Sequence, residues 1–140
     1  MTDSANVALV RSVYAAWERG DYTSVAWADP EIEYVQADGP LPGTWRGLTG
    51  LAEVAREWFD AWKDFRAEAK EYWELDDERV LVLVRVSGRG KTSGLELGQT
   101  HTDAAGVFHI RGGKVSRVVI YFDRDRALAD LGLPSEGDAA

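Results

Sequence analysis

The first half of the chain carries apolar residues at helical spacing, in two separate stripes. The first stripe predicts a helix over residues 5–19, and the second predicts an amphipathic helix over residues 49–64. The first stripe consists of Val10, Val13, Tyr14 and Trp17, and the second of Leu51, Val54, Ala55, Trp58, Trp62 and Phe65. The second stripe is expected first of all to pack against the core. The alternative interpretation is that one of its tryptophans faces a ligand.

Between these helices the pattern changes to short elements. A short helix is predicted after Asp21, and Pro30 ends it because the residue before a proline resists the helical conformation. A strand is predicted over residues 31–36, with Ile32, Tyr34 and Gln36 on one face. Residues 38–50 contain two prolines and four glycines, which predicts a loop long enough to cover a pocket mouth.

The second half alternates with the period of β-strands. Strands are predicted over residues 65–75, 79–87 and 95–110, the last with a bulge at 104–106. Arg111-Gly112-Gly113-Lys114 then predicts a tight hairpin turn, because both glycines tolerate left-handed backbone. Alternation along the hairpin places Phe108, Val118, Ile120 and Phe122 on the inner face and His109, Arg117 and Tyr121 on the outer face. Asp123 is expected to cap a closing helix that ends at Gly132.

Helices followed by consecutive hairpin-linked strands predict an α+β fold with a curved antiparallel sheet. Three helices from the first half would cover its concave face, and a short C-terminal helix would close the chain. The length of 140 residues is that of a single domain, 1–140, with a core over about 5–133.

Charge and composition exclude several classes of function. The net charge of -8 disfavours nucleic acid as a partner, since a phosphate backbone would be repelled. The absence of cysteine excludes disulfides, thiolate metal sites and a cysteine nucleophile. Neither a signal peptide nor an apolar run long enough to span a membrane is expected, and a cytoplasmic location is the default.

The chain resembles the NTF2-like superfamily, and within it the SnoaL-like branch of polyketide cyclase and steroid isomerase relatives. The carrying features are VYAAWERGDY at 13–22, WADPEIEYV at 27–35, Trp45-Arg46-Gly47, IRGGKVSRVVIYFDR at 110–124 and ALADLGL at 127–133. The resemblance implies a cone with a pocket between sheet and helices, often in a dimer. It does not fix a function, because the superfamily contains isomerases, cyclases, hydrolases, dehydratases and binding modules.

The catalytic groups of these relatives do not transfer directly. Tyr34 takes the position of the isomerase base, Val13 that of the helix phenol, with Tyr14 one residue away, and Gly106 that of the protonated aspartate. Asp123 falls near the cyclase aspartate, where it is also needed as a helix cap. Arg85 is the strand arginine of an epoxide-hydrolase arrangement, and it falls on the outer face.

The residues by themselves suggest four candidates for chemistry. His101 and Asp103 stand two apart in one strand and could act as a general base with its partner, or form a polar pair on the outer face. Tyr14 and Tyr34 are candidate hydrogen-bond donors to a ligand carbonyl, or structural phenols. His101 and His109 are too far apart in one strand to share a metal, so no metal site is expected. The sequence has no Gly-rich phosphate loop after a strand and no nucleophile elbow, so no cofactor is expected.

These candidates lead to two hypotheses. The first is a cofactor-free acid–base enzyme, of isomerase, cyclase or hydrolase/dehydratase type, on a hydrophobic polyketide- or terpenoid-like molecule, with Tyr14, Tyr34, His101 and Asp103 as catalytic groups. The second is a binding or assembly module without catalysis. The predicted ligand-binding residues are Trp17, Trp58, Trp62, Val82, Val84, Phe108, Val118, Ile120 and Phe122. A homodimer through Leu81, Leu83, Val119 and Tyr121 is expected from the habit of the family.

Overall fold

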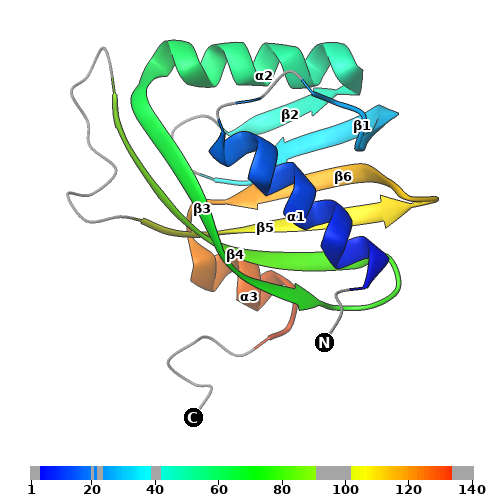
Figure 1. Cartoon of the computed structure of the whole chain (residues 1–140). Coiled ribbons are helices and arrows are strands. Elements are labelled where there is room, and N and C mark those ends of the chain that lie inside the picture. Colours follow the sequence, from blue (N-terminus) through cyan, green and yellow to red (C-terminus); the bar gives the residue numbers. More distant parts are fainter. Residues whose placement is uncertain (1–3, 20, 22–23, 39–41, 91–101, 134–140) are drawn as a thin grey trace.

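The described part of the chain forms one curved sheet of six strands and three helices (Figure 1). The computed structural model describes residues 4–19, 21, 24–38, 42–90 and 102–133, with 58–65, 88–90 and 102 described by their backbone alone. The helices are α1 (Ala5–Glu18), α2 (Gly47–Ala61) and α3 (Arg124–Asp130). The strands are β1 (Ala28–Gln36), β2 (Gly43–Arg46), β3 (Trp62–Glu74), β4 (Arg79–Gly90), β5 (Thr102–Arg111) and β6 (Lys114–Tyr121).

The order of strands across the sheet is β2-β1-β6-β5-β4-β3. Neighbours are antiparallel except for β1 and β6, which run parallel. A parallel pair requires a long connection between its strands, and most of the chain lies between these two. The predicted α+β fold is confirmed, and the sheet is mixed where a purely antiparallel one was expected.

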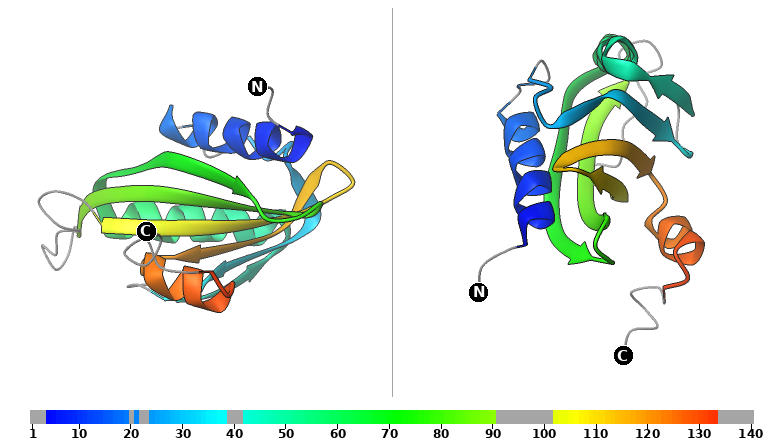
Figure 2. Two further views of the ribbon diagram at one scale, coloured as in Figure 1. Left: turned by 90° about the horizontal axis from the view of Figure 1, so that it is seen from below. Right: turned by 90° about the vertical axis from the view of Figure 1, so that its right-hand side faces the viewer.

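The helices lie on both faces of the sheet. Figure 2 shows α1 across the concave face and α3 on the opposite side. Helix α2 packs against β1, β2 and β3 and closes one end of the concave side. Of the three helices predicted for that side, the described residues form two.

The residue before α1 explains where this helix begins, whereas the structure contradicts the short helix predicted after Asp21. The Ser4 side chain accepts a hydrogen bond from the Val7 amide and caps α1, as predicted. The short helix predicted after Asp21 is wrong for the described residues 24–30, which make a turn and the start of β1. Asp21 instead accepts hydrogen bonds from the amide and hydroxyl of Ser24. Pro30 lies where the β1–β6 register shifts, so its missing N–H interrupts no regular ladder.

Two further boundaries differ from the prediction. The loop expected at residues 38–50 contains β2, in which Trp45 pairs with Tyr34 of β1. The helix expected over 49–64 ends at Ala61, and Trp62 opens β3 opposite Gly90. The helical spacing therefore continues past the real end of the helix, because strand pairing with β4 decides the conformation from Trp62 onward.

The hairpin between β5 and β6 forms as predicted. Gly112 and Gly113 have φ of 59° and 77°, which suits a two-residue turn between twisted strands. The bulge predicted at residues 104–106 is wrong, since β4 and β5 pair in unbroken register there. The irregularity lies instead between His109 and Ile110, opposite β6.

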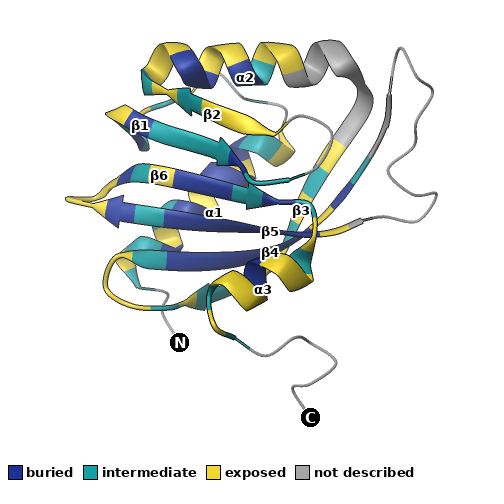
Figure 3. Cartoon of the chain, turned by 180° about the vertical axis from the view of Figure 1, so that it is seen from behind, coloured by how far each residue is buried: buried dark blue, intermediate teal, exposed yellow. Residues whose placement is uncertain are grey.

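Buried side chains form one cluster on each face of the sheet, and β4, β5 and β6 carry long buried stretches (Figure 3). The concave cluster joins the inner faces of the strands to α1 and α2, as the alternation predicted. The convex cluster packs under α3 through Ala127 and Leu128. It contains Leu81, Leu83, Val119 and Tyr121. The dimer surface predicted from these four residues is therefore wrong, because the chain covers them itself.

Among the described residues, no helix is both long enough and apolar enough to cross a membrane.

Candidate functional site

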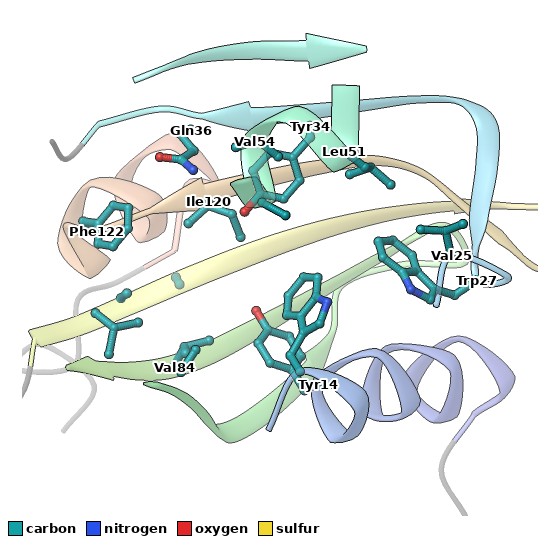
Figure 4. Close-up of a pocket in the computed structure, with 16 residues that line it drawn as sticks. Tyr14, Val25, Trp27, Tyr34, Gln36, Leu51, Val54, Val84, Ile120 and Phe122 are labelled. Atoms are coloured by element: carbon teal, nitrogen blue, oxygen red, sulfur yellow. The ribbon is translucent and has the colours of Figure 1, made fainter. Parts of the chain in front are cut away.

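A cavity of about 110 Å³ lies between the concave face of the sheet and helices α1 and α2. On this measure one water needs about 10–15 Å³, so the cavity can hold several waters or a small organic molecule. Figure 4 shows its lining, which is mostly apolar and aromatic. The lining residues are Tyr14, Trp17, Val25, Trp27, Tyr34, Gln36, Leu51, Val54, Ala55, Ala67, Val84, Val86, Ala104, Ala105, Ile120 and Phe122.

Helix α1 places Tyr14 at the centre of the cavity wall. Its side chain is 2% exposed and makes edge-to-face contacts with Trp17 and Phe108, at centroid distances of 5.1 and 5.6 Å. The hydroxyl lies directly over Gly106 of β5, where a Cβ atom would stand 2.9 Å from the tyrosine oxygen. The absence of a side chain at Gly106 is therefore what admits the phenol at this depth.

The phenol of Tyr14 stays protonated at neutral pH. Burial, and then the proximity of Tyr34 and Tyr72, raise the pKa of Tyr14 well above its usual value. Strand β1 supplies Tyr34 from the opposite wall, where its ring packs edge-on against Trp45 at 6.4 Å. Both hydroxyls point into the cavity (Figure 4). The two phenols can donate hydrogen bonds to an acceptor between them.

The end of β1 adds two polar residues that were not predicted as site residues. Gln36 lines the cavity and is 4% exposed. Asp38 follows and accepts a hydrogen bond from the Phe122 amide at 2.6 Å, which joins the end of β1 to the end of β6. The alternation of residues 31–36 already put Gln36 on the face of Tyr34. For Asp38 the sequence carried no signal, since its role depends on the β1–β6 pairing.

The structure describes three of the four predicted catalytic residues and separates one of them from the other two. Tyr14 and Tyr34 line the cavity together. Asp103 lies on the convex side, where its side chain is 50% exposed and pairs with Arg85 at 3.6 Å. The prediction that Asp103 acts in the pocket is therefore wrong, because unbroken β4–β5 register turns this residue outward. His101 lies outside the described residues.

Four of the predicted ligand-binding residues line the cavity, namely Trp17, Val84, Ile120 and Phe122. Val82, Phe108 and Val118 were placed on the correct face, yet they are fully buried in the core and do not line the cavity. They pack in one buried cluster with Val10 and Tyr14 of α1. The side chains of Trp58 and Trp62 lie outside the described residues.

Asp123 and His109, two other polar residues considered in the sequence, lie away from the cavity. The Asp123 side chain caps α3 by accepting a hydrogen bond from the Arg126 amide. His109 pairs with Arg117 on the convex face and is half-buried. Burial, followed by the charges of Arg117 and Arg79, lowers the pKa of His109 below its usual value. Neither Asp123 nor His109 lines the cavity.

The cavity lining contains donors and one amide, but no carboxylate or imidazole among the described residues. The described residues also bring no three histidines, cysteines or acids together as metal ligands. The arrangement can therefore bind and orient a neutral, mainly apolar molecule through a few hydrogen bonds.

Comparison with known proteins agrees with this geometry. The family model for a SnoaL-like domain matches residues 10–118. No curated protein matches the chain.

Several solved structures share the fold. An NTF2-like protein of unknown function from Burkholderia pseudomallei has 22% sequence identity and a TM-score of 0.75, over 91% of this chain and 97% of its own. TerC, crystallised with polyporic acid, has 23% identity and a TM-score of 0.73, over 91% and 98%. A candidate polyketide cyclase from Xanthomonas campestris has 21% identity and a TM-score of 0.66, over 89% and 95%.

Proposed function

The chain belongs to the SnoaL-like domain family, and from the geometry of its cavity we propose that it binds a flat, hydrophobic, carbonyl-bearing small molecule. The observation that carries the proposal is the pair of phenols, Tyr14 and Tyr34, on opposite walls of a mainly apolar cavity. The aromatic walls match a planar ring system, and two neutral donors match a carbonyl oxygen. Crystallisation of TerC with polyporic acid supports a small organic ligand in a similar fold.

Binding of 1-tetralone, a bicyclic aromatic ketone, tests this proposal. Trp17 and Trp27 line the cavity, so quenching of tryptophan fluorescence reports occupancy. Each of Tyr14→Phe and Tyr34→Phe should weaken binding by roughly twofold to tenfold, since a net hydrogen bond contributes about 0.5–1.5 kcal/mol. Tetralin, which lacks the carbonyl, should bind the wild type and both variants equally.

Tyr121→Phe provides a matched control. The Tyr121 hydroxyl donates a hydrogen bond to Asp130 on the convex side, away from the cavity. This variant should bind 1-tetralone as the wild type does. Failure of 1-tetralone to bind, or equal loss of affinity in the control, would show that the phenols do not form a ketone site.

One observation favours a second function, cofactor-free proton transfer. A buried phenol held neutral can stabilise the negative charge that develops on a carbonyl oxygen when solvent water takes a proton from a neighbouring carbon, since the described cavity lining supplies no carboxylate or imidazole base. Exchange of the C2 protons of 1-tetralone with D₂O, followed by NMR, measures this activity. Exchange faster than in buffer, and slower in Tyr14→Phe, would establish an isomerase- or cyclase-type enzyme. Binding without such exchange would assign a binding module.

A further inference from the structure

Gln36 stands out as a buried polar side chain at one end of the cavity. It is the buried polar residue of the described core, and its Oε1 accepts no hydrogen bond from any described residue. Figure 4 shows it at the same end as Phe122, with Val25 and Trp27 toward the other end. Trp27 directly precedes the first residue of β1, and Gln36 is the last residue of this strand. The buried amide of Gln36 therefore lies at one end of the cavity.

An unpaired buried acceptor is costly. Burying an amide oxygen without a partner costs about 1–3 kcal/mol, and most buried side-chain polar atoms in proteins are paired. Methionine would fill a similar volume without this cost. The position therefore carries a group that folding alone does not favour, which is typical of a binding site.

The backbone that follows Gln36 is held to β6 by two hydrogen bonds. The Ala37 amide donates to the Ile120 carbonyl at 2.9 Å, and the Phe122 amide donates to Asp38 at 2.6 Å. These bonds fasten the last residues of β1 to those of β6. The amide of Gln36 is thus presented from a rigid part of the sheet, as a preorganised ligand contact requires.

Asp38 also has a buried oxygen, Oδ2, that accepts no hydrogen bond from the part of the chain that the structure describes. Its Oδ2 lies 3.9 Å from a guanidinium nitrogen of Arg126, which balances its charge. Asp38 does not line the cavity. Of these two residues, Gln36 is the one that lines the cavity.

We infer that Gln36 accepts a hydrogen bond from a hydroxyl group of the ligand, and that the ligand is therefore a planar hydroxyketone. This inference rests on the proposed ketone site. The phenols of Tyr14 and Tyr34 offer donors to the carbonyl, and the Oε1 of Gln36 accepts from a hydroxyl. Tyr34 and Gln36 stand two apart on one face of β1, about 6–7 Å between Cα atoms. The carbonyl and hydroxyl therefore lie on opposite sides of a one- or two-ring system.

Binding of 6-hydroxy-1-tetralone and 1-tetralone to the same proteins tests this inference. The two probes differ only in the hydroxyl that would face Gln36. The wild type should bind the hydroxyketone roughly twofold to tenfold more tightly, the range expected for one net hydrogen bond. In Gln36→Met the preference for the hydroxyketone should disappear, so that both probes bind with the same affinity. The Tm of Gln36→Met without ligand should equal or exceed that of the wild type.

Each outcome bears on a different claim. Equal binding of both probes by the wild type would overturn the role of Gln36 while leaving the ketone site intact, and this comparison needs no variant. An equal fold loss of affinity for both probes in Gln36→Met would leave the preference for the hydroxyketone intact. This result would also overturn the role of Gln36, because the residue would then only shape the cavity. Failure of both probes to bind the wild type would overturn the ketone site and the inference together. Tyr121→Phe should keep the wild-type preference.

Discussion

The close approach of Tyr14 to Gly106 makes a sharp prediction for Gly106→Ala. The added Cβ would stand 2.9 Å from the tyrosine oxygen, 3.2 Å from a ring carbon of Phe108 and 3.3 Å from the end of Ile120. Overpacking of this kind costs about 1–3 kcal/mol. Replacement of glycine by alanine in an unstrained position stabilises a protein by about 0.4–1 kcal/mol through the unfolded chain. The net effect should be a loss of about 1–2 kcal/mol.

Guanidinium unfolding followed by tryptophan fluorescence measures this loss. At about 2.1 cal/mol/K per residue, a chain of 140 residues should show a fall in Tm of about 3–7 °C. Gly106→Ala should also weaken the binding of 1-tetralone, because Tyr14 must move away from the cavity centre to make room. The ring contacts of Tyr14 with Trp17 and Phe108 leave it little freedom to do so without cost.

The double variant with Tyr14→Phe isolates the cause. Removing the hydroxyl removes the atom with which the new Cβ collides most closely. Gly106→Ala should therefore be close to neutral in the Tyr14→Phe background, with a coupling of about 1–2 kcal/mol between the two sites. A coupling below about 0.3 kcal/mol, or an undiminished Tm for Gly106→Ala alone, would refute the packing of Tyr14 over this glycine.

Two further predictions concern the convex side. His109 has a pKa lowered by burial and by Arg117 and Arg79, so the unfolded chain binds a proton more readily than the folded one. Stability should therefore fall as the pH drops below the usual histidine value of about 6.5, and His109→Asn should flatten this part of a Tm-versus-pH curve; an unchanged slope would contradict the assignment. Asp123→Ala should cost about 0.5–2 kcal/mol by removing the cap of α3, whereas Asp123→Asn should cost little because asparagine caps equally well. Denaturant unfolding measures the stability of both Asp123 variants. An equal loss of stability in the alanine and asparagine variants would contradict a capping role.

Several elements follow from local sequence alone. The apolar stripe and the Ser4 cap specify α1, and the paired glycines at 112 and 113 specify the hairpin, because both depend on contacts between residues close in the chain. The cap of α3 by Asp123 belongs to the same class. Alternation along β1 correctly placed Tyr34 and Gln36 on one face. For these features the local conformational preference and the tertiary structure agree.

Other features depended on which segments meet in space. The division of the concave face into packed core and open cavity follows from where α1 lies, so Val82 and Val84 share a face and yet only Val84 lines the cavity. Asp103 turns outward because β5 pairs with β4 without a bulge.

The sequence by itself determined the fold class, the two phenols as candidate donors and the sides of most strands, because a period of two or 3.6 residues is a local property. Only the tertiary structure decided that Tyr14 reaches Gly106 and that the buried Oε1 of Gln36 has no hydrogen-bond partner among the described residues. Both facts arise from contacts between strands and helices far apart in the chain. Their energies depend on distances of a few tenths of an ångström that no residue pattern encodes.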